Sequence, residues 1–172
     1  MKFQNSCVIR VPSHRLWDYL TGIPNVAMCL PGVEEVHALE DGKFAGIVVL
    51  KVGVVKLRLA GNITIELMDG ERYVASMRVQ AADQRISGLI QARMTMNLEK
   101  LNPEETKLIV DTDLNLLGKI GEFGQGMIQK KAGQMMAEFA GNVASNVGGF
   151  PEPVGERVQP GSAGGPSEDP PR

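Results

Sequence analysis

The feature that most limits the possible folds is a change of hydrophobic period along the chain. Between residues 56 and 116, three successive segments carry apolar side chains at every second position, with polar side chains between them. This period is typical of strands that bury one face and leave the other in water. From residue 118 to about 147 the period becomes helical. The sequence therefore predicts an antiparallel meander followed by a long C-terminal helix, which is an α+β architecture.

The alternation also predicts which side chains share a buried face. The turn signals Asp41-Gly42, Asp69-Gly70 and Asn102-Pro103 separate the strand-like segments. The apolar members of the three segments are Leu57, Leu59, Ile63, Ile65 and Leu67, then Ile86, Ile90, Met94, Met96 and Leu98, then Leu108, Val110, Leu114 and Leu116.

The N-terminal segment predicts one strand and two short helices. Residues 3–11 are strand-like and end at Pro12, after which Ser13 is a candidate N-cap for a helix over 14–20. A second helical piece begins at Pro24 and stops at Pro31-Gly32. One strand, two small helices, about six antiparallel strands and a long helix make up the helix-grip fold. In that fold a curved sheet wraps the C-terminal helix and leaves an internal apolar cavity.

The predicted C-terminal helix contains an unusual number of glycines. A helix of about 30 residues is roughly 45 Å long, enough to lie along the whole concave face of the sheet. Gly121, Gly124, Gly126 and Gly133 fall within it, and each lowers helix stability by about 1 kcal/mol relative to alanine. Packing must therefore hold this helix, or it is free to shift and act as a gate together with Pro31-Gly32.

The length and composition predict one structured domain and a tail. A chain of 172 residues has room for one domain of ordinary size. Residues 148–172 hold six glycines and six of the ten prolines, so we expect a helix-grip domain over 1–147 and a disordered tail over 148–172. The 18 basic and 20 acidic residues give a net charge of −2, which argues against a nucleic-acid binder.

The sequence also indicates a compartment. The two cysteines do not make a disulfide framework, which favours a reducing environment. The N-terminus lacks the apolar run of a signal peptide, and no stretch approaches the roughly 18 apolar residues of a membrane span. We therefore expect a cytoplasmic protein with at most peripheral membrane contact.

Few residues suggest catalysis. His14 and His37 have no recognisable nucleophile partner, and Cys29 is more simply a buried thiol than a reactive one. Asp111 and Asp113 share a polar strand face, and the scattered acids and histidines do not have metal-ligand spacing. We expect no catalytic residue and no metal site.

Methionine is frequent on the faces that are expected to point inward. The chain has 9 methionines but only 5% aromatic residues, and flexible thioethers suit ligands of variable shape. A core simply filled by methionine is the alternative, and the sequence leaves both open. The residues expected to line the apolar site are Leu57, Leu59, Ile63, Met77, Ile90, Met94, Met96, Val110, Ile120, Phe123 and Met127.

Three segments resemble a known family. They are Met28-Cys29-Leu30-Pro31-Gly32-Val33-Glu34, Asp41-Gly42-Lys43-Phe44, and Val48 to Lys56, which reads Val-Val-Leu-Lys-Val-Gly-Val-Val-Lys. Over residues 1–147 the chain resembles the CoxG family of carbon monoxide dehydrogenase subunits, which belongs to the START-like, SRPBCC superfamily. It departs from the family at Val54, where proline is expected.

The resemblance implies a function beside a molybdenum hydroxylase such as aerobic carbon monoxide dehydrogenase. We expect a non-enzymatic protein that binds a respiratory quinone, menaquinone or ubiquinone, without a covalent cofactor, and couples that enzyme to the membrane quinone pool at the inner face of the cytoplasmic membrane. Gln91, Arg93 or Asn97 would orient the quinone head if strand twist brings them inward. A membrane-recruitment or assembly factor without a ligand is the alternative, and a cyclase- or hydrolase-like START enzyme is the weakest interpretation.

Overall fold

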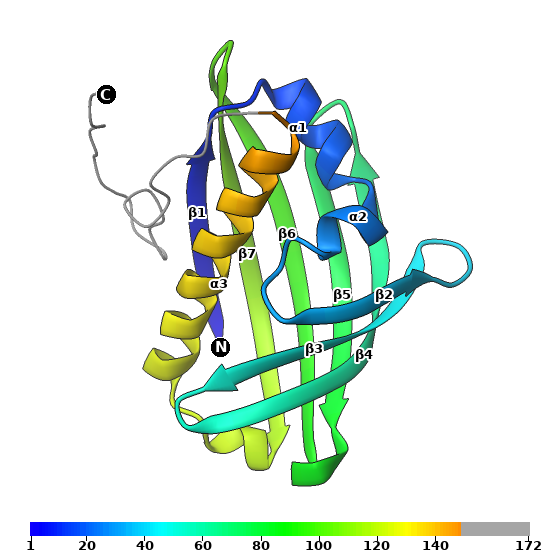
Figure 1. Ribbon diagram of the computed structural model, residues 1–172, viewed down its shortest axis with the longest axis vertical. Helices are drawn as coiled ribbons and strands as arrows, with labels where there is room; N and C mark the ends of the chain where they lie inside the picture. Colours follow the sequence, from blue (N-terminus) through cyan, green and yellow to red (C-terminus); the bar gives the residue numbers. More distant parts are fainter. Residues whose placement is uncertain (149–172) are drawn as a thin grey trace.

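The computed structural model describes residues 1–148, which form one curved sheet and its covering helices (Figure 1). The elements in chain order are β1 (Lys2–Ile9), α1 (Ser13–Leu20), α2 (Ile23–Ala27), β2 (Val33–Ala38), β3 (Lys43–Val52), β4 (Val55–Asp69), β5 (Val74–Asp83), the 3-10 turn η1 (Gln84–Ile86), β6 (Gly88–Asn102), β7 (Glu105–Gly118), the 3-10 turn η2 (Lys119–Glu122) and α3 (Gln125–Asn146). This order confirms the predicted α+β helix-grip architecture. The predicted tail lies outside the described residues apart from Gly148, so the boundary at 147 stays a prediction.

The sheet is antiparallel throughout, and its strand order is β1-β7-β6-β5-β4-β3-β2. The pairing that joins distant parts of the sequence is that of β1 with β7, from Lys2↔Asp113 to Ile9↔Thr106. Helix α3 lies along β1 at one side of the sheet, while β2 and β3 cross in front of the other side (Figure 1). The helix therefore covers only part of the concave face.

Two facing glycines allow the sheet to curve. Gly46 of β3 and Gly61 of β4 are register partners, and each meets its neighbouring strand more closely than a side chain permits. A Cβ atom at Gly61 would lie 2.6 Å from the Cα and 2.7 Å from the Cβ of Ala81 on β5. Glycine in a strand often marks such a bend. Figure 1 shows β3 and β4 crossing the front of the sheet. We assign this bend to the close approach of the strands at the two glycines.

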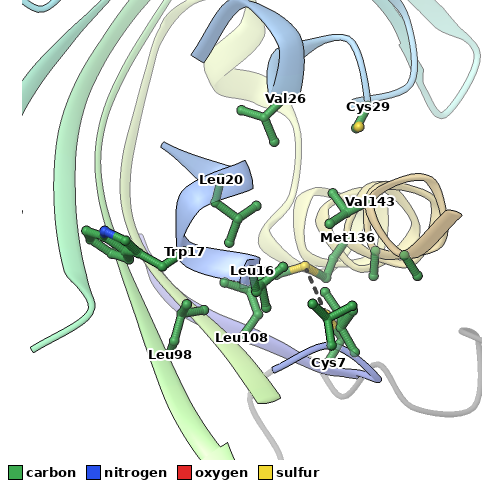
Figure 2. Packing of buried hydrophobic residues seen from close by; sticks show 14 of the residues in the cluster. Cys7, Leu16, Trp17, Leu20, Val26, Cys29, Leu98, Leu108, Met136 and Val143 are labelled. Carbon is green, nitrogen blue, oxygen red and sulfur yellow. Dashed lines mark hydrogen bonds between the residues drawn. The ribbon is translucent and has the colours of Figure 1, made fainter. Parts of the chain in front are cut away.

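The inward-facing side chains form two separate hydrophobic clusters. The upper cluster joins α1, α2, the second half of α3 and strands β1, β5, β6 and β7. Its centre includes Leu16, Leu108 and Val143, all at most 1% exposed (Figure 2). The lower cluster consists of Val52, Leu57, Leu59, Ile120 and Ile128 with the partly buried residues around them. The sheet is thus packed at one end by α1, α2 and the second half of α3, and at the other end by η2 and the start of α3.

Three local expectations are wrong. The C-terminal helix is shorter than predicted, because Gly118 adopts a positive φ of 73° and Phe123 is extended, so that α3 begins only at Gln125. Leu67 is 47% exposed because a β-bulge between Ile65 and Leu67 breaks the alternation. Ser13 does not cap α1, since its hydroxyl instead contacts the Thr106 hydroxyl at 2.8 Å.

A buried carboxylate ties the lower end of the sheet together. Asp83 is 1% exposed and accepts hydrogen bonds from the Arg58 amide at 2.8 Å and from the Arg85 amide at 2.9 Å. The Arg85 guanidinium also donates to it, and the same guanidinium reaches the Lys56 carbonyl at 3.2 Å. These donors, the Arg85 side chain first, hold the pKa of Asp83 well below its usual range.

We expect the Asp83→Asn variant to lower the melting temperature by an amount that depends on pH. In this variant the NH2 group of the asparagine, itself a hydrogen-bond donor, faces the N–H groups of Arg58 and Arg85 and cannot accept from them. The lowered folded-state pKa means that the carboxylate contributes its full stability above the unfolded-state pKa of about 4, and that this contribution is lost as the pH falls towards the folded-state pKa. Melting curves from pH 7 to pH 2 should therefore show a gap between wild type and variant that narrows below about pH 4. The exposed Asp113→Asn variant is the control, and a gap that is constant over this range would contradict the assignment.

Candidate functional site

The middle of the concave face carries a belt of apolar side chains that neither cluster covers. Parity along each strand fixes their direction, because alternate residues on the same strands belong to one of the two clusters. The belt comprises the apolar residues Phe44, Ile63, Ile65, Met77, Val79 and Met94, which are only partly buried and pack against neither cluster, together with the partly buried Thr112.

The strand register brings these residues into two rows across the sheet. In one row Thr112, Met94, Met77 and Ile65 are successive cross-strand partners on β7, β6, β5 and β4. In the next row Val79, Ile63 and Phe44 are successive partners on β5, β4 and β3. Cross-strand partners have Cβ atoms about 5 Å apart, so each row is a continuous strip. Thr112 is the polar member of the belt, and it lies at the β7 end.

Helix α3 is only partly buried over the stretch that lies between the two clusters. Its buried residues are Ile128 in the lower cluster and Met136, Ala140, Val143 and Ala144 in the upper cluster. The seven helical positions between Ile128 and Met136 contribute no buried side chain. These two turns of the helix therefore leave the belt without the tight cover that the ends of the sheet receive.

The second half of α3 is fixed by polar contacts as well as by packing. Asn142 donates to the Cys29 carbonyl at 2.8 Å, and Asn146 donates to the Tyr19 hydroxyl at 3.1 Å. Cys7 on β1 contacts the Met136 sulfur at 3.9 Å (Figure 2). The first half has one buried anchor, Ile128, so it is the part of the helix that can move at the least cost.

The predicted lining residues fall in three places. Ile63, Met77 and Met94 belong to the belt, and Met96 and Val110 lie at its upper edge, where they pack against the upper cluster. Five others belong to the lower end, either within the cluster or packed against it: Leu57, Leu59, Ile90, Ile120 and Phe123. Met127 is 45% exposed at the start of α3, close to Gly53 in the β3–β4 turn.

Sequence reasoning missed four belt residues. The alternation places Ile65 on the correct face, and its spacing from Ile63 was sufficient to include it in the belt. Val79 and Thr112 lie two residues from the expected lining residues Met77 and Val110, so the alternation gives their direction. Only the strand register places them and Phe44 in one belt with Met77 and Met94.

The expected head-group residues point the wrong way. Gln91, Arg93 and Asn97 are at odd positions of β6, opposite in parity to the inward-facing Met94 and Met96. Arg93 instead forms an ion pair with Glu66 on the outer face, with Nε 3.1 Å from Oε1. The hydrogen bond from Arg93 is the main reason that the pKa of Glu66 is lowered. Regular pleating thus excludes the strand twist that this expectation required.

Within residues 1–148 the histidines and cysteines lie away from the belt. His14 and His37 are exposed on the surface. Cys7 is buried, and its desolvation raises the pKa of the thiol to about 12, which leaves no reactive thiolate at neutral pH. Cys29 is 2% exposed and lies 3.3 Å from the Tyr19 hydroxyl.

The described part of the chain has neither a metal-ligand cluster nor a membrane-spanning helix. Within residues 1–148 no three histidine, cysteine or acidic side chains come together as metal ligands do. No helix in this range combines the length and the hydropathy needed to cross a membrane.

Comparison with solved structures gives the fold. A conserved protein from Geobacillus kaustophilus superimposes with a TM-score of 0.77 at 17% identity, covering 86% of this chain and 95% of that one. The Zhui aromatase/cyclase from Streptomyces sp. R1128 gives 0.64 at 15% identity, with 86% and 93% covered. A START superfamily protein from Mycobacterium smegmatis gives 0.61 at 10% identity, with 86% and 97% covered. At these identities the likeness concerns the helix-grip fold alone.

Comparison of the sequence with protein families gives the lineage. No curated protein sequence matches the chain. The family model for CoxG, a subunit of carbon monoxide dehydrogenase, matches residues 6–148, which extend from the middle of β1 through α3. Proteins of the same fold include enzymes such as the aromatase/cyclase, so the fold alone does not assign an activity. The chain belongs to the CoxG family of carbon monoxide dehydrogenase subunits.

Proposed function

We propose that this protein is a non-enzymatic carrier that holds a respiratory quinone against the belt. The observation that carries the proposal is the uncovered, almost entirely apolar strip between two well-packed clusters. A packed core has few voids, whereas ligand sites are mostly apolar surfaces with a few polar groups. An apolar molecule laid along the belt would bury these side chains and meet no charge on it.

A quinone with an isoprenoid tail fits the chemistry of this surface. Each methylene that leaves water contributes about 0.8 kcal/mol, so a long tail needs few polar contacts. Met77 and Met94 are cross-strand partners at the centre of the belt, and their thioethers adapt to irregular ligands. Menaquinone and ubiquinone share this ring-and-tail design, and the same surface serves either.

We propose that the partner is a molybdenum hydroxylase. The family is named for carbon monoxide dehydrogenase, and a carrier would exchange quinone and quinol between such an enzyme and the membrane pool. The carrier itself then needs no electron-transfer cofactor, because the quinone transports the electrons.

The β3–β4 turn is the surface that we propose for peripheral contact with the inner face of the cytoplasmic membrane. Val54 at its tip is 94% exposed, and Met127 beside it is 45% exposed. Lys51 and Lys56 flank this turn and are exposed. Exposed apolar side chains among lysines are suited to an anionic lipid surface. The start of α3, its least anchored part, lies at this same turn (Figure 1).

The proposal predicts that the protein carries quinone when it is purified from a quinone-producing host. Organic extraction followed by mass spectrometry and ultraviolet absorbance should give a near-stoichiometric amount. Protein that emerges empty should load after incubation with quinone-containing vesicles. The carrier function is wrong if the protein neither carries quinone nor loads with it. That outcome would favour the recruitment or assembly factor.

A further inference from the structure

One buried polar side chain beside the belt has an NH2 group that finds no hydrogen-bond partner within residues 1–148. Asn5 on β1 is 5% exposed, and its Nδ2 finds no hydrogen-bond acceptor among the described residues. An unmet donor of this kind is costly in a folded protein and is usually avoided. Three other polar residues are also buried, namely Ser6, Ser13 and Thr106, but none of them has a buried side-chain polar atom without a hydrogen-bond partner. The orphaned amide therefore requires an explanation.

Asn5 lies between the upper and the lower hydrophobic cluster. On the same strand, Cys7 belongs to the upper cluster and Phe3 packs against the lower one. Asn5 has the parity of these two residues and therefore faces inward. Its register partner on β7 is Val110, and the residue paired with Phe3 is Thr112 of the belt. Asn5 and Thr112 are thus diagonal neighbours on adjacent strands.

The polar groups gather at one end of the rows. Asn5 and Thr112 lie on β1 and β7, whereas Met94, Met77 and Ile65 continue the same strip across the sheet with apolar side chains alone. A ligand with an oxygen-bearing head and an apolar tail would match this polarity in one orientation only. The head would lie near β1 and the tail would run towards β4.

We propose that the Asn5 amide is the polar anchor of the ligand, donating a hydrogen bond from Nδ2 to a carbonyl oxygen of its head group. This inference rests on the proposed function, because it assigns the orientation and one specificity contact of the same site. An apolar residue would fill the position with less cost to the free protein, whereas an amide discriminates in favour of ligands that carry an oxygen acceptor.

The test compares two probes that differ in the acceptor. Decylubiquinone carries ring carbonyls, and decylbenzene has a ring and the same alkyl chain without oxygen. We expect Asn5→Leu to weaken decylubiquinone binding about 10-fold, the effect of one hydrogen bond, and to leave decylbenzene binding unchanged. Asn115→Leu, on the outer face of β7, is the matched control and should change neither affinity. The melting temperature of Asn5→Leu should not fall, since the variant removes an unmet donor.

A measurement on the unaltered chain covers the case in which the variant does not fold. The side-chain amide resonances of Asn5 in a nitrogen–proton NMR spectrum should move on addition of decylubiquinone and stay in place with decylbenzene. Equal losses for both probes, or unchanged affinities together with unmoved resonances, would overturn the anchor while the carrier function stands. If the wild type binds neither decylubiquinone nor decylbenzene, the proposed function itself is wrong.

Discussion

Gly61→Val is expected to destabilise the protein strongly. The Cβ at this position would fall within 2.7 Å of Ala81, and also against the Gln80 carbonyl. The obstacle is backbone and a Cβ rather than the end of a flexible side chain, so β4 and β5 would have to separate. Overpacking a core costs about 1–3 kcal/mol and sometimes more, and valine adds two further methyl groups. We expect a loss of at least about 3 kcal/mol, which is a large part of the roughly 5–15 kcal/mol of an ordinary domain.

Urea unfolding followed by circular dichroism measures this effect. Gly126→Ala is the matched control, because no atom lies within 4 Å of its added Cβ. That substitution lies in the first turn of α3 and should stabilise the protein by up to about 1 kcal/mol. A Gly61→Val protein that unfolds with the midpoint of the wild type would show that the close approach of β4 and β5 does not hold in solution.

Met94→Gln is expected to reduce quinone affinity about 10-fold or more. The two side chains are of similar length, but glutamine brings an amide to the middle of the belt, where its cross-strand partners are Met77 and Thr112. Burying an amide with unmet hydrogen bonds against an apolar tail costs about 1–3 kcal/mol, and about 1.4 kcal/mol is a tenfold change in affinity. In the free protein the partly buried position keeps the amide in contact with water, so stability should change little.

Met68→Gln provides the comparison. Met68 follows the bulge in β4 and is 43% exposed, so the same chemical change there should leave quinone affinity unchanged. Titration of both variants with decylubiquinone, followed by tryptophan fluorescence or calorimetry, measures the difference. Equal affinities for the two variants would mean that the ligand does not lie along the belt.

Much of the fold could be predicted from local patterns. The alternation of Leu57, Leu59 and Ile63, the proline and glycine signals between elements, and the helical period after residue 118 were sufficient for the order of elements and the helix-grip architecture. The buried state of Cys29 and the outward direction of Asp111 also agree with expectation. These properties depend on neighbours within a few residues, where period and turn chemistry act directly.

The errors arose where a local pattern met a backbone irregularity. The bulge after Ile65 exposed Leu67, and the positive φ of Gly118 with the extended Phe123 shortened α3. Ser13 is an adequate capping residue by type, but Thr106 from β7 offered its hydroxyl a partner distant in the sequence. In each case the backbone conformation of one residue, or a contact between residues distant in the sequence, outweighed the local preference for alternation, helix or capping.

The sequence by itself determined the family, the element order and the inward parity of the apolar residues, because these follow from chain-local chemistry. Only the tertiary structure decided which inward residues are packed and which form the belt. That distinction depends on where α3 lies over the sheet and on the register that aligns Thr112, Met94 and Met77 in one row. The same register placed Asn5, a residue that no motif marks, beside the belt, where its Nδ2 has no hydrogen-bond partner within residues 1–148. The alternation of side chains along a strand fixes the face on which each one lies. Its burial depends on which other elements pack against that face.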